Sequence, residues 1–147
     1  MDAMAADAAV DLAALVQAAG DGVIVADPTG RIVFWNPAAE RIFGWSPAEA
    51  VGQSLDLIIP ERFRARHWEG YRTVMQTGRT RYGADVLRVP ALAKDGRRIS
   101  IAFTVALLTG GDGTVSGIAA IVRDETRRWE EEQALRRRVA ELERARG

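Results

Sequence analysis

The pattern of apolar and polar positions changes along the chain, and its first part predicts a helix followed by a hairpin. Apolar residues at helical spacing predict a short helix over residues 7–19, which Gly20 ends. Residues 22–27 and 31–35 are apolar runs separated by Pro28-Thr29-Gly30, in which proline fixes φ and glycine tolerates positive φ. The two runs therefore predict a β-hairpin.

The segment after the hairpin predicts a series of short helices. Asn36 and Ser46 are each followed by proline, the pattern of a capping side chain before the first helical position. A third short helix is expected at residues 54–58 and a longer one over residues 60–76, which carries His67. This part of the chain forms a helical insert between strands.

Beyond Gly78 the apolar residues recur with period two, which indicates strands. The three expected strands cover residues 86–93, 99–107 and 115–122. Lys94-Asp95-Gly96 and Gly110-Gly111-Asp112-Gly113 are the turns between them.

The order of the elements predicts an α+β fold with a five-stranded antiparallel sheet, a short-helix insert on one face, and flanking N- and C-terminal helices. We expect an N-terminal helix within residues 1–19, a globular domain over residues 20–126 and a C-terminal helix over residues 127–147. Insert and sheet are expected to face each other across a cavity. In the C-terminal helix the apolar residues follow the spacing of a coiled-coil seam: Leu135, Val139 and Leu142.

Charge and composition narrow the function classes. The 147 residues carry 20 basic and 20 acidic side chains, which argues against a nucleic-acid-binding chain. Residues 1–60 carry net charge −6 and residues 61–147 net charge +6, with the excess around the His67 helix and the sheet. That distribution suits a bound anion or an acidic neighbour.

Two residue counts limit the metal chemistry. The absence of cysteine excludes disulfides, cysteine-ligated zinc and iron–sulfur clusters, and a single histidine excludes sites that need two. No nucleophile elbow or phosphate-binding loop is present, so we expect no enzymatic activity. The N-terminus is acidic and no apolar run reaches membrane-spanning length, which predicts a cytoplasmic protein without a membrane partner.

Residues 20–126 resemble the PAS, or sensory-box, domain family. The resemblance rests on the order and spacing of several stretches: residues 22–27, Ile32–Glu40, Phe43-Gly44-Trp45, Glu49–Gly52, Lys94-Asp95-Gly96 and Arg123–Thr126. It implies a sensor for signal transduction, in a two-component system or in the regulation of transcription. It also implies that the strand ending at Asp124 passes the signal to the helix beyond Thr126.

The segment Pro60 to His67 further resembles the helix of haem-binding oxygen-sensor PAS domains. That resemblance implies haem b with His67 as the proximal iron ligand, and a gas bound on the open side. The cofactor-binding residues it implies are His67, Arg64, Arg88, Tyr71, Leu87, Leu107 and Ile118. The oxygen-stabilising arginine of that group falls near Leu87, so a bulge in the strand would be needed to turn Arg88 toward the ligand, and a tryptophan indole is the alternative donor.

Other interpretations of the same residues stay open. The cavity would also suit a non-haem apolar ligand, and a filled core would leave a domain that only dimerises or docks a partner. The arginines of the His67 helix, among them Arg62, Arg64, Arg66 and Arg72, are explained equally by a solvated helix face. Trp35, Trp45 and Trp68 are expected in the core, and Trp129 on a packing surface. We expect a homodimer through the terminal helices.

Overall fold

A computed structural model describes residues 9–80 and 84–147, and its elements follow the predicted order. Part of the predicted N-terminal helix, residues 7 and 8, lies outside the described residues. The elements are α2 (Leu12–Ala18), β1 (Gly22–Ala26), β2 (Ile32–Trp35), α3 (Pro37–Phe43), α4 (Pro47–Ala50), the 3₁₀-helix η2 (Leu55–Ile58), α5 (Glu61–Thr77), β3 (Leu87–Leu92), β4 (Arg98–Thr109), β5 (Val115–Asp124) and α6 (Thr126–Arg146).

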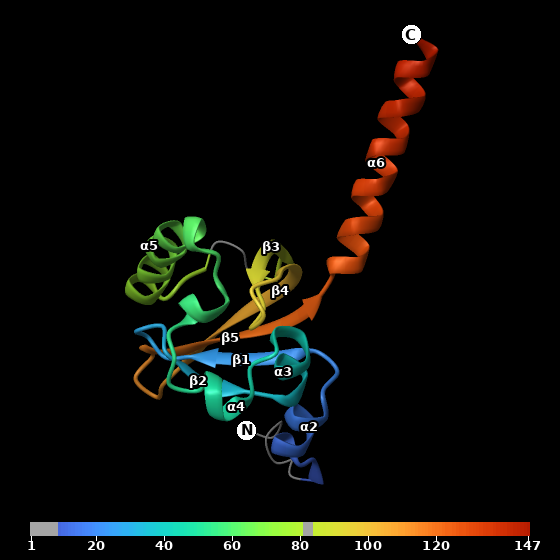
Figure 1. Cartoon of the computed structure of the whole chain (residues 1–147). Helices are drawn as coiled ribbons and strands as arrows, with labels where there is room; N and C mark the ends of the chain where they lie inside the picture. The colour runs from blue at the N-terminus through green and yellow to red at the C-terminus, as the bar shows by residue number, and fades with distance from the viewer. Residues whose placement is uncertain (1–8, 81–83) are drawn as a thin grey trace.

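The five strands form one antiparallel sheet in the order β2-β1-β5-β4-β3 (Figure 1). The N-terminal hairpin and the three C-terminal strands meet where β1 pairs with β5, with Ile24 opposite Ala120. The helical segments between β2 and β3 form the predicted insert. The α+β fold with a five-stranded antiparallel sheet is therefore confirmed.

Bulky side chains between the sheet and α3 form the main core. Ile32 and Phe43 are fully buried, and Trp35 is 2% exposed. The Trp35 and Phe43 rings pack with centroids 5.4 Å apart. Trp45 packs against the edge of this core, and its backbone oxygen accepts a hydrogen bond from Trp35 Nε1 at 2.8 Å. The expectation of a core position is thus confirmed for Trp35, whereas Trp45 is partly buried and packs against the core.

Asn36 is a fully buried polar side chain that joins three elements. Its Oδ1 accepts hydrogen bonds from the backbone N–H groups of Val23 and Ala39, at 2.8 and 3.0 Å. Its Nδ2 donates to the backbone oxygens of Val16 and Asp21, at 2.9 and 3.1 Å. One side chain therefore caps α3, orders the start of β1 and fixes the end of α2.

The C-terminal helix α6 projects away from the rest of the structure (Figure 1). None of its residues is buried, and Trp129, Leu135, Val139 and Leu142 are 50–64% exposed. Its apolar stripe is therefore open to a partner. Within the described residues, no helix has the length and apolar character needed to cross a membrane.

Candidate functional site

A cavity of about 120 Å³ lies between the insert and the inner face of the sheet. Two of its twelve lining side chains carry polar atoms, and the others are hydrocarbon. The lining residues are Ile24 of β1; Leu55, Ile58 and Ile59 in and after η2; His67 and Tyr71 of α5; Ile101, Phe103 and Val105 of β4; and Ile118, Ala120 and Val122 of β5.

The strand residues reach the cavity because of the period-two alternation and the pairing register. Ala120 lies opposite Ile24 of β1 on one side and Val105 of β4 on the other. Phe103 lies opposite Val122 in the same way. Since directly opposed residues share one face of a sheet, these side chains all point toward the insert.

Helix α5 contributes His67 and Tyr71, which are four residues apart and so lie on one helix face. Tyr71 is 7% exposed, and its hydroxyl donates a hydrogen bond to the backbone oxygen of Asp27 at 2.6 Å. Burial raises the pKa of Tyr71 to about 12, with a further contribution from the negative charge of Asp27. This bond fastens α5 to the turn between β1 and β2.

Trp68 closes the contact between α5 and the same turn. Its Nε1 donates to the carboxylate of Asp56 at 2.7 Å, and its ring lies against Gly30. Gly30 has φ +88°, and a Cβ there would overlap the Trp68 ring. A glycine is therefore required both for the turn and for the helix to approach it. Trp68 is only partly buried and does not line the cavity.

His67 is partly buried at the cavity wall, and its Nδ1 is buried without a hydrogen-bond partner among the described residues. Burial lowers the pKa of His67 below its ordinary value, and the negative charge of Asp56 opposes that shift. The edge of the imidazole meets Trp68 at 4.7 Å between centroids, and Tyr71 lies at 5.7 Å. The lowered pKa favours the neutral form of this imidazole, which lies at the wall of an apolar cavity.

Of the other residues implied by the resemblance, Tyr71 and Ile118 line the cavity, and four do not. Leu87 and Leu107 are paired with the lining residues Phe103 and Ile118, so they lie on the inner face just beyond the cavity.

Arg64 turns back toward the segment before α5. Its guanidinium donates to the backbone oxygens of Ile59 and Asp56, at 3.0 and 3.3 Å.

Arg88 requires a correction. The pairs between β3 and β4 run without a bulge, so Arg88 lies opposite Ala102 on the outer face of the sheet. There it forms an ion pair with Glu125 at 3.3 Å. The register shift that would bring it to the cavity is absent, because each residue of β3 keeps one partner and alternation fixes its face.

Most of the cavity wall was missing from the expected site. The sequence signal was available in the alternating residues of β4, since Phe103 and Val105 belong to the same apolar face as Leu107. Leu55, Ile58 and Ile59 offered no comparable signal, because a short apolar run before Pro60 does not reveal which side chains point inward.

The end of β5 is joined to the start of α6 by a compact set of hydrogen bonds. Thr126 donates to the Asp124 carboxylate through Oγ1 at 2.6 Å and through its backbone N–H at 2.9 Å. Thr126 Oγ1 also accepts from the backbone N–H of Ser100 at 3.0 Å, and Glu125 N–H donates to the Ser100 oxygen at 2.8 Å. The first turn of α6 is therefore anchored on β4 and β5.

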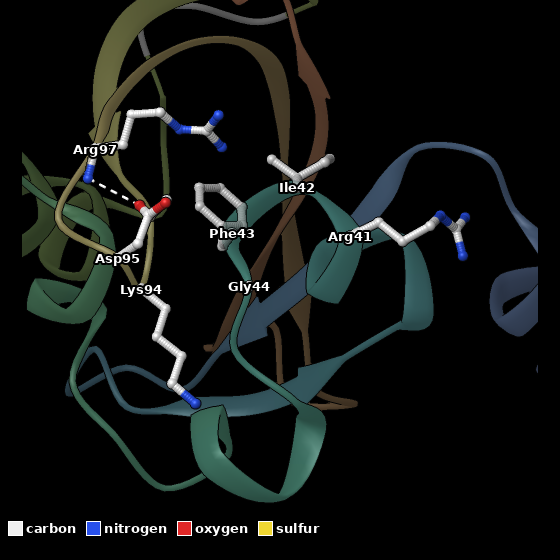
Figure 2. Close-up of a pocket in the computed structure, with 8 residues that line it drawn as sticks. Arg41, Ile42, Phe43, Gly44, Lys94, Asp95 and Arg97 are labelled. Carbon is white, nitrogen blue, oxygen red and sulfur yellow. Dashed lines mark hydrogen bonds between the residues drawn. The ribbon is translucent and has the colours of Figure 1, made fainter.

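A larger hollow of about 480 Å³ lies at the surface between the end of α3 and the β3–β4 turn. Figure 2 shows that the charged ends of Arg41, Lys94 and Arg97 lie apart from one another. Lys94 is paired with Glu49 at 2.7 Å. This surface does not converge on one ligand, so the apolar cavity beneath α5 is the better candidate site.

The family model described as the PAS fold matches residues 11–124. The chain belongs to the PAS family and is a sensory signal-transduction domain.

Named relatives agree with this assignment. The chain is 33% identical over 125 residues to the sensor protein FixL of Bradyrhizobium diazoefficiens. This alignment covers 84% of the chain and 23% of FixL. It is also 29% identical over 103 residues to the oxygen sensor protein DosP of Escherichia coli. That alignment covers 70% of the chain and 13% of DosP. The chain thus spans less than a quarter of the length of these two relatives.

A solved structure shows the same fold. The PAS domain of a protein from Colwellia psychrerythraea superposes with a TM-score of 0.69 at 22% identity, over 79% of this chain and 95% of that domain.

Proposed function

We propose that this chain is a non-catalytic sensory module that binds a small apolar ligand in the cavity beneath α5 and transmits its occupancy to α6. The observation that carries the proposal is the apolar cavity, one wall of which is the strand that leads into α6. A domain with only a packing role has no need of such a space, because protein interiors are normally close-packed.

The path from cavity to helix is short. Ile118, Ala120 and Val122 of β5 line the cavity, and α6 begins at Thr126, four residues after the last of them. A ligand changes the state of α6 only by binding one arrangement of β5 and α6 more tightly than another. The hydrogen bonds of Thr126 join the end of β5 to the first turn of α6, so a shift of β5 would also move the start of the helix.

The cavity volume limits the size of the ligand. An apolar cavity of about 150 Å³ in another protein stays dry and binds benzene. The cavity described above has about 120 Å³ and a similar hydrocarbon lining, so a ligand near the size of one aromatic ring matches it.

Titration with benzene and toluene, followed by amide NMR, tests this proposal. We expect saturable shifts at Ile118, Ala120 and Val122 and at residues near Thr126, with little change at the surface turn Asp112–Gly113. Shifts confined to the cavity would contradict transmission to α6. The absence of any shift at the cavity residues would overturn ligand binding.

Haem b is a second candidate, favoured by His67 and by similarity to an oxygen sensor protein. The donor chemistry fits, since an unpartnered imidazole nitrogen at a cavity wall suits an iron ligand. The volume does not fit: about 120 Å³ is far below the roughly 300–1,000 Å³ of pockets for larger ligands. The cavity in this structure is therefore too small for haem.

The visible spectrum decides this candidate. The chain is purified with haem supplied, beside the variant His67→Ala. A Soret band that is present in the wild type and lost in the variant would establish haem binding through His67. A colourless wild type after reconstitution would eliminate it.

We further propose that the chain forms a homodimer through its terminal helices. The support is the exposed apolar stripe of α6, together with Leu12 and Leu15 of α2, which are 50% and 59% exposed. Sedimentation of a chain ending at Thr126 should show weaker association than the full chain. An unchanged dimer would exclude a role for α6, and a chain that dimerises but binds no ligand would be an interaction domain.

A further inference from the structure

We propose that the ligand carries one polar group and that the His67 imidazole is the hydrogen-bonding subsite that recognises it. The ligand class is then a single aromatic ring with one hydroxyl or amino substituent, of which phenol is the simplest member. This inference rests on the proposed function, because it concerns the same cavity.

The first step is that one polar side chain of the cavity lining, the His67 imidazole, forms no hydrogen bond within the described residues. Only His67 and Tyr71 contribute polar side chains to the lining. The Tyr71 hydroxyl already donates to the Asp27 backbone oxygen at 2.6 Å. His67 Nδ1 is buried and has no partner.

The second step is that nearby protein groups do not satisfy this nitrogen. Asp56, the acid whose charge acts on His67, accepts the Trp68 indole N–H at 2.7 Å and lies 3.9 Å from Arg64. Trp68 and Tyr71 pack around the imidazole. More than about nine in ten buried polar groups in proteins are paired, so the imidazole that lines the cavity is expected to find a partner outside the chain.

The third step separates an organic ligand from water. A buried water typically makes about three hydrogen bonds, and apolar cavities stay dry. Water in this cavity would have the His67 imidazole and a wall that is otherwise hydrocarbon. A ligand with one polar atom and an apolar ring meets both parts of the wall. Each imidazole nitrogen is a donor or an acceptor according to the tautomer, and a phenolic hydroxyl serves either.

Calorimetric titration with phenol and toluene, which have similar shapes, tests the inference. We measure the ratio of the two association constants in the wild type and in His67→Leu. Because one neutral hydrogen bond contributes modestly, the ratio should fall about two- to tenfold in the variant. The matched control is Thr104→Val, a change in the strand β4 at a residue outside the cavity lining, which should leave the ratio unchanged.

The outcomes are distinguishable. If both compounds bind and the ratio is the same in wild type and His67→Leu, the hydrogen-bonding subsite is wrong and the proposed function stands. If neither compound binds the wild type, both the function and this inference are overturned. Should His67→Leu fail to fold, His67→Met also removes the imidazole and is judged by the same ratio.

Discussion

Filling the cavity with two carbon atoms tests whether it exists as an apolar space. Ala120 lines the cavity between its cross-strand neighbours Ile24 and Val105. The next residue along β5 in the N-terminal direction, Ala119, lies opposite Val25 and Ala106 on the outer face. The variants Ala120→Val and Ala119→Val therefore add the same atoms to the same strand, inside and outside the cavity.

The expected magnitude follows from the volume. At about 24 cal/mol per Å³, a cavity of about 120 Å³ corresponds to about 3 kcal/mol of lost stability. Two added carbons recover about 1.6 kcal/mol if they are buried without strain, at about 0.8 kcal/mol each. Valine also favours a strand, and Ala119→Val measures that contribution separately because it buries less surface.

Urea unfolding followed by tryptophan fluorescence measures both free energies, and ligand titration is repeated on each variant. We expect Ala120→Val to exceed Ala119→Val in stability by about 1 kcal/mol and to lose binding of benzene and toluene. Ala119→Val should keep it. A loss of 1 kcal/mol or more in Ala120→Val alone would mean that the space is already filled and would refute the reasoning.

Three further predictions concern the contacts that hold the site. Asn36→Ala should lower the free energy of unfolding by about 3 kcal/mol in urea, because it leaves buried N–H groups unpaired, whereas the exposed cap variant Asp11→Ala should lose about 1 kcal/mol or less. The Tyr71 pKa of about 12 exceeds its ordinary 10.0, so the unfolded chain loses its proton first and stability should fall between pH 10 and 12. In thermal melts, the variant Tyr71→Phe should therefore lose less stability than the wild type between pH 10 and 12. Thr126→Ala should increase hydrogen exchange at the Ser100 amide, with Thr126→Ser restoring protection; equal exchange in all three proteins would contradict the anchor.

The fold could be predicted because its signals are local. The Pro28-Thr29-Gly30 turn and the side-chain caps of Asn36 and Ser46 each act within a few residues, and all form as expected. The long strand β4 carries its alternation through most of its length. These elements could be predicted from backbone preferences and the spacing of apolar side chains alone, because none of them depends on contacts distant in the sequence.

The residues of the candidate site were harder to predict from the sequence, because they come together only through tertiary packing. Tyr71 and Ile118 reach the cavity, but the Asp27 oxygen that Tyr71 binds is 44 residues away in sequence. Arg88 shows the limit most clearly. Its position on β3 was known, yet which face it occupies depends on a register that only the pairing with Ala102 reveals.

That register gives the outer face its own connection to α6. Arg88 is paired with Glu125, and Arg123 donates to the Asp21 carboxylate through two nitrogens at 3.1 Å each. These exposed ion pairs are individually weak, so they adjust easily when the strands shift. The inner face of β5, in contrast, carries the apolar side chains of Ile118, Ala120 and Val122, which line the cavity. Under the proposed function, a ligand in the cavity would therefore act on α6 through these three side chains.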